Sequence, residues 1–177
     1  MKNILITGGA GYIGSHVAEV LIKKKKKTFI VDNLSTGFKR LINKKSNFFR
    51  VDILKTEKIK KIIVNNKIDS VIHLAGSLII SVGEKYPKRY FRNNVLGTKS
   101  LLAACKNTPV KNFIFSSTAA VYKDKQKIVN ENSQIMPKSI YGKTKIKAEK
   151  LITTNCKKTG INYAILRYFN VCGASPS

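Results

Sequence analysis

Apolar residues along the chain follow two alternating patterns. Short runs such as Ile4-Leu5-Ile6 and Phe113-Ile114-Phe115 lack polar alternation, which predicts strands covered by helices on both faces. Longer segments between these runs repeat apolar residues at helical spacing. The predicted strands are residues 3–7, 28–32, 47–52, 70–74, 110–116 and 162–169. The predicted helices are residues 13–25, 56–65, 87–106 and 139–158.

This alternation predicts one α/β domain over residues 1–177, built as a doubly wound parallel sheet, the Rossmann fold. The 177 residues are enough to bury a core, and 43% of them are hydrophobic. No apolar run reaches the roughly 18 residues of a membrane span, and the first residues lead into a strand rather than a signal peptide. We therefore expect a cytoplasmic protein with no membrane partner.

Lysine dominates the charge and gives a formal net charge of +25. Taken alone, this charge favours nucleic acid or an anionic surface as a partner. The lysines are scattered along the chain, however, and the block at residues 23–27 comes at the end of a predicted helix, where cations complement the helix dipole. We therefore expect no nucleic-acid partner.

Three cysteines bear on disulfides and metals. Cys105, Cys156 and Cys172 are odd in number, widely spaced and without a CxxC pair. This spacing supports neither a disulfide framework nor a zinc site. We expect free, buried thiols and no bound metal.

A glycine-rich segment, Gly8-Gly9-Ala10-Gly11-Tyr12-Ile13-Gly14, follows the first predicted strand and opens the first predicted helix. Gly8, Gly11 and Gly14 permit a tight turn and let the backbone approach a pyrophosphate. The helix N-terminus at Tyr12 and Ile13 would meet the phosphate charge. The segment therefore predicts a dinucleotide site.

Asp32 ends the second predicted strand, as an acidic residue does in dinucleotide-binding folds. Its carboxylate is expected to bond the adenosine ribose hydroxyls and to repel an additional 2′-phosphate. The sequence therefore favours NAD over NADP. Lys39 and Arg40 could reverse this preference, but we expect them to face solvent.

Other candidate cofactor contacts come where further strands end, because these ends meet at the carboxyl edge of a parallel sheet. Asp52-Ile53 ends the third predicted strand and is expected to contact the adenine side. Leu74-Ala75-Gly76 is small enough for a cofactor to approach, whereas His73 before it is interpreted as a structural residue. Asn94 lies inside a predicted helix, where asparagine is intrinsically poor, and is expected to tie a loop through buried polar contacts.

Candidate catalytic residues come later in the chain. Ser116-Ser117-Thr118 follows the fifth predicted strand, where a hydroxyl can orient a substrate oxygen. A helix cap or a Ser/Thr turn is the alternative role. Tyr141 and Lys145 are one helical turn apart, so the lysine is expected to lower the pKa of the phenol from its usual value of about 10. This arrangement predicts a tyrosine base for hydride-transfer chemistry.

In this order the motifs resemble the extended short-chain dehydrogenase/reductase family, which includes NAD-dependent nucleotide-sugar epimerases and dehydratases. The resemblance covers the whole chain. It rests on Thr7-Gly8-Gly9-Ala10-Gly11-Tyr12-Ile13-Gly14-Ser15-His16, Asp32-Asn33-Leu34-Ser35, His73-Leu74-Ala75-Gly76, Asn93-Asn94-Val95, Phe115-Ser116-Ser117-Thr118-Ala119-Ala120-Val121-Tyr122, Tyr141-Gly142-Lys143-Thr144-Lys145 and Arg167-Tyr168-Phe169-Asn170.

The resemblance implies an isomerase that inverts C4 of a UDP-hexose through a 4-keto sugar, with NAD as a retained cofactor, as in galactose metabolism. It implies that Thr118 is the catalytic hydroxyl and Tyr141 the base, both in contact with substrate. Lys145 would bind the nicotinamide ribose, Asn33 would join the NAD contacts, and Asn170 would contact the nucleotide-sugar.

Two departures from the family qualify this expectation. Related dehydratases carry an Asp-Glu pair after the threonine, and here Ala119-Ala120 cannot transfer protons, which disfavours dehydration. Family members continue into a C-terminal substrate domain, which we expect to be absent here, so that the chain is the N-terminal part. The alternatives are an NAD-binding module or inactive fragment without turnover, and a member acting on a different nucleotide-sugar. A homodimer is compatible with each of these alternatives.

Overall fold

The computed structural model describes residues 2–124 and 128–175, which form a six-stranded parallel sheet. The strand order is β3-β2-β1-β4-β5-β6, so the chain winds outward twice from the centre and the predicted doubly wound Rossmann fold is confirmed. The strands are β1 (Asn3–Thr7), β2 (Lys27–Asp32), β3 (Asn47–Arg50), β4 (Ser70–His73), β5 (Asn112–Thr118) and β6 (Asn162–Tyr168).

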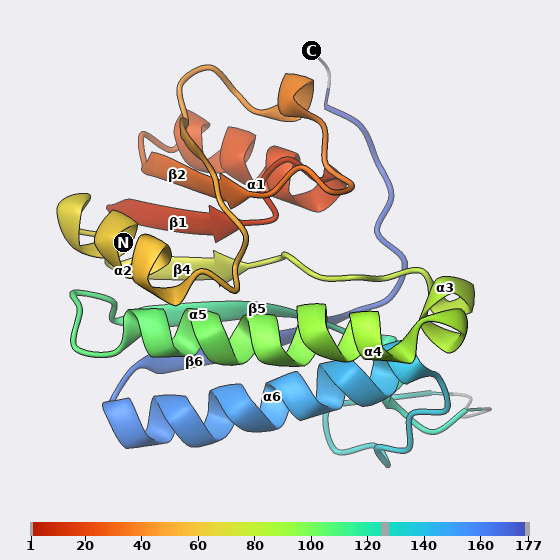
Figure 1. The fold of residues 1–177 in the computed structure, drawn as a ribbon. Coiled ribbons are helices and arrows are strands. Elements are labelled where there is room, and N and C mark those ends of the chain that lie inside the picture. Colours follow the sequence, from red (N-terminus) through yellow and green to blue (C-terminus); the bar gives the residue numbers. More distant parts are fainter. Residues whose placement is uncertain (1, 125–127, 176–177) are drawn as a thin grey trace.

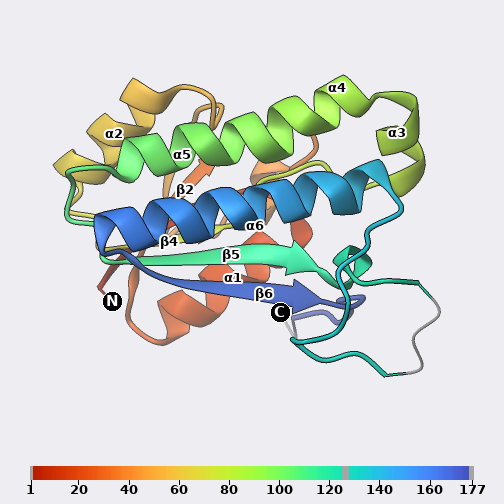
Figure 2. The ribbon, with the colours of Figure 1, turned by 90° about the horizontal axis from the view of Figure 1, so that it is seen from below.

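Helices cover the two faces of the sheet unequally (Figures 1 and 2). α2, α5 and α6 lie side by side on one face, and α1 lies on the other. The helices are α1 (Tyr12–Lys23), α2 (Thr56–Asn65), α3 (Ile80–Lys85), α4 (Pro87–Tyr90), α5 (Gly97–Cys105) and α6 (Ile140–Thr159). Single 3-10 turns are formed by η1 (Lys39–Leu41) and η3 (Ala119–Val121), and a π-helical turn by η2 (Phe91–Leu96).

Unbroken apolar strands build a core on each side of the sheet. In β1, Leu5 packs into the large cluster under α2, α5 and α6, whereas Ile4 and Ile6 pack into the smaller cluster under α1. All three side chains are fully buried. The strand therefore needs apolar residues on both faces, as its sequence predicted.

The predicted helix over residues 87–106 is interrupted. It divides into α4, η2 and α5, which run on without a loop. The widened π turn places Asn94 inward, where 2% of it is exposed. α3 was not predicted, because its six residues carry no helical periodicity. A π turn is common at functional sites and has no simple sequence signature.

Several strand ends differ from prediction by one or two residues, and two of them carry candidate site residues. The third strand ends at Arg50, and Asp52 instead turns the chain by accepting the Leu54 amide at 2.9 Å. β5 continues to Thr118, because it stays paired with β6 as far as Tyr168. The Ser116-Ser117-Thr118 cluster therefore lies inside the strand and not after it.

The three cysteines differ in exposure. Cys105 and Cys156 are free and buried as predicted, but Cys172 is exposed, so the prediction is wrong for that thiol. No helix within residues 2–124 and 128–175 is long and apolar enough to cross a membrane. In the same part of the chain no cluster of His, Cys, Asp and Glu could hold a metal ion.

The edge strand β6 is joined to α6 by an ion pair between a partly buried Arg167 and a buried Glu149. Arg167 donates from Nε and Nη2 to the two carboxylate oxygens of Glu149, at 3.1 and 2.7 Å. Ser117 of β5 donates a short hydrogen bond to the same carboxylate. Arg167 also donates to the Tyr122 hydroxyl at 3.2 Å. These contacts link β5, β6 and the helix that carries Tyr141.

We predict that Arg167→Met lowers the free energy of unfolding by about 3 kcal/mol, because it leaves the Glu149 carboxylate buried without its cation. The control is Lys138→Met, which removes the exposed Lys138–Asp124 pair and should change the free energy by less than about 1 kcal/mol. Urea unfolding followed by circular dichroism measures both. Equal losses in the two variants would contradict the prediction.

Candidate functional site

The glycine-rich loop joins β1 to α1 at the carboxyl edge of the sheet. Gly8 has φ +75°, and a Cβ there would lie 2.6 Å from the Ala75 amide nitrogen. A Cβ on Gly14 would lie 2.2 Å from the Gly8 carbonyl oxygen. The N-cap of α1, Gly11, makes no side-chain cap, and the first turn contains no acidic residue. The positive helix end at Tyr12 and Ile13 is thus open to an anion.

Asp32 connects this loop to the end of β2. Its Oδ2 accepts the Ala10 amide at 3.1 Å, and its Oδ1 accepts the Leu34 amide at 2.8 Å. Both oxygens keep a further lone pair for a ribose hydroxyl. The predicted ribose-binding acid therefore lies beside the predicted phosphate loop. Lys39 and Arg40, the residues that could favour NADP, are exposed.

The structure brings the β3 end next to Asp32. Asn33 donates from Nδ2 to Asp52 Oδ2 at 3.1 Å, which joins two residues that were expected to contact NAD. The Ile53 side chain points into the core instead, where a Cβ on Gly97 would come within 2.4 Å of its Cδ1. Asp52 and Asn33 lie at the carboxyl edge of the sheet, whereas Ile53 belongs to the large core cluster.

Asn94 ties the segment after β4 to the helix of Tyr141, as predicted. Its Oδ1 accepts the Ser77 amide at 2.7 Å, and its Nδ2 donates to the Ser77 carbonyl and to Thr144 Oγ1, both at 3.0 Å. A Cβ on Gly76 would lie 3.0 Å from Asn94 Oδ1. Leu74, Ala75 and Gly76 are thereby held beside the glycine loop.

Thr118 and Tyr141 come together at the end of β5. Thr118 Oγ1 accepts the Ala120 amide at 3.1 Å, so its own proton is free to be donated. Burial raises the pKa of Tyr141 above its ordinary value, while the Thr118 hydroxyl acts in the opposite direction. The prediction of a lowered Tyr141 pKa is therefore wrong for this structure, because desolvation of the phenolate outweighs the nearby donor.

Lys145 lies one turn further along α6 and is only 6% exposed. Its Nζ is 4.2 Å from the centre of the Phe115 ring. Burial lowers the pKa of Lys145 to about 7, and the charge of Glu149 partly offsets this. A lysine with a pKa near neutrality is suited to hold or release a proton there.

Several residues that the sequence did not indicate position α6. Ser139 caps the helix by accepting the Gly142 amide at 3.0 Å, and Glu84 of α3 accepts the Ile140 amide at 2.7 Å. A Cβ on Gly142 would lie 2.5 Å from the Ala120 carbonyl oxygen. The serine before α6 is a recognisable helix cap in the sequence. The Glu84 contact joins residues 56 positions apart, and no local pattern in the sequence indicates it.

Residues 169–175 return from β6 along the carboxyl edge to α1 (Figure 1). Tyr12 donates its hydroxyl proton to the Gly173 carbonyl at 2.5 Å, and Ser175 donates to Glu19 at 2.8 Å. Asn170 is exposed at the start of this segment. The glycine loop, Asp32, Thr118 and the start of α6 therefore lie at the carboxyl edge of the sheet, whereas the Leu74 side chain, like that of Ile53, packs against a core cluster.

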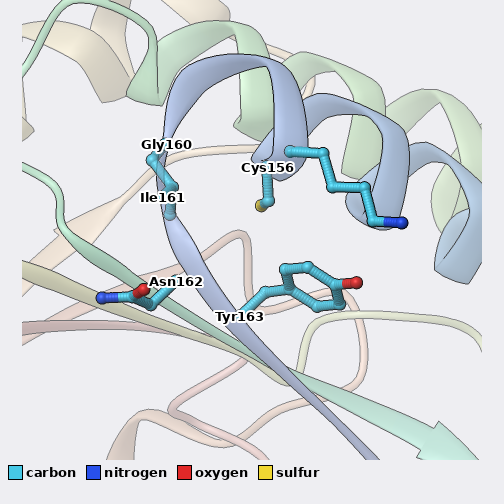
Figure 3. Close-up of a pocket in the computed structure, with 6 residues that line it drawn as sticks. Cys156, Gly160, Ile161, Asn162 and Tyr163 are labelled. Carbon is cyan, nitrogen blue, oxygen red and sulfur yellow. The ribbon is translucent and has the colours of Figure 1, made fainter.

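A hollow at the opposite end of α6 carries no part of this constellation. Figure 3 shows it where α6 turns into β6, lined by Cys156, Lys157, Gly160, Ile161, Asn162 and Tyr163. Cys156 is buried and burial raises the pKa of its thiol to about 11, so it is a poor nucleophile. The candidate site therefore remains at the carboxyl edge.

Comparison with known proteins agrees with this geometry. Residues 4–177 match the NAD dependent epimerase/dehydratase family. The UDP-glucose 4-epimerase of Lactobacillus helveticus is 40% identical over 173 residues, which cover 97% of this chain and 52% of the relative.

Two solved structures have the same fold. The UDP-glucose 4-epimerase of Brucella ovis in complex with NAD has a TM-score of 0.94 and 37% identity, and covers 99% of this chain and 54% of that one. The Thermotoga maritima enzyme with UDP-glucose has a TM-score of 0.92 and 35% identity, and covers 97% of this chain and 56% of that one. The chain spans about half the length of the relatives it matches. Because the match in sequence and in fold extends over nearly all of its residues, the chain belongs to the NAD dependent epimerase/dehydratase family.

Proposed function

We propose that the chain forms the NAD-binding and proton-transferring half of an epimerase that inverts C4 of a UDP-hexose, interconverting UDP-glucose and UDP-galactose. The observation that carries the proposal is the hydrogen bond between Thr118 and Tyr141, with Lys145 one turn further along α6, in a fold whose glycine loop is held by Asp32. The relatives' names and bound ligands support the substrate class. Because the chain spans about half of them, an NAD-binding module without turnover is the second candidate.

The residues present fit NAD. Gly8 and Gly14 form a tight turn in which any side chain would clash with the backbone, and the uncapped start of α1 suits a pyrophosphate. Asp32 suits an unphosphorylated ribose. Bound there, NAD would supply a hydride acceptor and donor at the carbon that is inverted.

The residues of the chain supply proton transfer and orientation. Tyr141 would take the proton of the sugar 4-hydroxyl as the C4 hydride leaves, and would return it after the sugar turns over. Thr118, whose oxygen already accepts the Ala120 amide, would donate to the sugar oxygen and hold it near the phenol. Ala119 and Ala120 offer no second acid or base, which supports epimerisation over loss of water.

Asp32→Ala should weaken NAD binding by about 1 to 3 kcal/mol, because it removes hydrogen bonds to a charged group. NADP should bind wild type more weakly than NAD, and the variant should narrow that gap by removing the repulsion. Calorimetry with both nucleotides measures this. Glu57→Ala is the control, since it makes the same change in net charge at an exposed position of α2. Equal or tighter NADP binding by wild type would contradict the assignment.

Tyr141→Phe should lower epimerase turnover by roughly 10² to 10⁴, the contribution of a general base, while NAD affinity stays close to wild type. The assay follows UDP-glucose and UDP-galactose, with the chain joined to the C-terminal half of the Lactobacillus helveticus relative. Tyr86→Phe, at an exposed phenol, serves as the control. Near-normal turnover in Tyr141→Phe would refute the assignment of the base. NAD binding without turnover in every form would favour the binding module.

A further inference from the structure

His73 occupies a buried position between the cofactor loop and the helix of Asn94. It ends β4, is 1% exposed, and is paired in register with Thr7, the residue immediately before the glycine loop. Its Nδ1 is 2.7 Å from Thr7 Oγ1, and its Nε2 is 3.0 Å from Thr98 Oγ1 of α5. The imidazole therefore bridges the strand that leads into Gly8 and the helix that follows the π turn.

The positions of the protons on His73 and its two threonine partners follow from the hydrogen bond that Thr98 makes to Asn94. Thr98 Oγ1 lies 2.7 Å from the Asn94 carbonyl, which can only accept, so the single proton of Thr98 is directed there. The bond between Thr98 and His73 then needs Nε2–H as its donor. In a neutral ring Nδ1 carries no proton, and it accepts from the Thr7 hydroxyl.

The surroundings keep this ring neutral. Burial, with the nearby Lys145 as the second cause, lowers the pKa of His73 to about 3. The ring packs against Phe115, with 5.4 Å between centroids, and against Phe113, with 6.1 Å. No carboxylate among the described residues accepts from either nitrogen, and both hydrogen-bond partners are hydroxyls. Neutral histidine can thus give one donor and one acceptor in fixed directions.

The bridge continues to the residue proposed as the base. The Asn94 carbonyl is held by Thr98, and the Asn94 side chain donates to Thr144 Oγ1. Thr144 in turn donates to the Tyr141 carbonyl at 2.8 Å. One buried path therefore joins the start of the glycine loop to the first turn of α6.

We propose that His73 is a positioning residue, a neutral imidazole protonated on Nε2 that fixes the glycine loop relative to the π turn and, through Asn94, relative to Tyr141. Its contribution to cofactor binding rests on the proposed NAD site. Its protonation does not, and can be tested in the protein without any nucleotide.

The first test is the tautomer of His73, measured by two-bond ¹H–¹⁵N correlation NMR of the ¹⁵N-labelled chain between pH 5.5 and 8. We expect Nε2 protonated and Nδ1 unprotonated throughout this range. His16, the other histidine, is an internal comparison, because its Nδ1 lies 2.8 Å from the Tyr12 carbonyl and must be the donor there. A protonated Nδ1 or an imidazolium at His73 would overturn the proposal.

The second test separates positioning from stability. His73→Leu removes donor and acceptor, and should weaken NAD binding roughly tenfold, the scale on which groups behind a binding residue act. His73→Gln keeps an amide donor and acceptor, and should recover most of that loss. Ile72→Ala is the control, because this neighbour on β4 packs into the cluster under α1 and should lower stability alone. Affinities are measured by calorimetry at a temperature where each variant is folded. Unchanged affinity in His73→Leu would overturn the positioning role, and so would equal weakening in Ile72→Ala.

Discussion

Lys145 belongs to the first part of α6, and its ammonium packs against the face of the Phe115 ring. The side chain is almost wholly removed from water. Burying a cation is unfavourable unless a partner compensates, and here the buried Glu149 carboxylate is already engaged by Arg167 and Ser117. The pKa of Lys145 is therefore lowered to about 7, so that the charged and neutral forms coexist near neutrality. A side chain in this state can respond to a nearby negative charge, as the tyrosine base that we propose would require.

The parallel sheet makes this arrangement possible. β5 contributes Phe115 to the lysine, Ser117 to Glu149 and Thr118 to the tyrosine, all within four residues. α6 is fixed at its start by Ser139 and Glu84, and along its length by Glu149. Strand and helix thus hold in register the side chains that we propose as catalytic. Such rigid support favours a defined geometry for proton transfer.

Local patterns were sufficient to predict much of the fold and the site. The short β-rich runs identified all six strands, and the glycine spacing with Asp32 identified the dinucleotide loop. The poor helix propensity of Asn94 correctly indicated a buried polar tie. In each case the residues that carry the signal are neighbours in sequence or repeat at a fixed period.

Features that depend on distant contacts could not be predicted in this way. The extension of β5 to Thr118 depends on pairing with β6, and the Arg167–Glu149 pair depends on how β6 meets α6. The pKa of Tyr141 was predicted in the wrong direction, because spacing on a helix reveals a nearby cation but not the burial of the phenol.

The most direct test of this account compares wild type with Lys145→Met in urea unfolding across pH. The folded protein binds the Lys145 proton with a pKa of about 7, against 10.5 for an ordinary lysine, so burial destabilises wild type fully below pH 7 and the cost disappears as pH rises toward 10.5. We predict that Lys145→Met is the more stable protein at pH 6, by an amount on the order of 3 kcal/mol, and that the difference closes by about pH 10. A variant less stable than wild type at pH 6, or a difference that does not change with pH, would contradict the account.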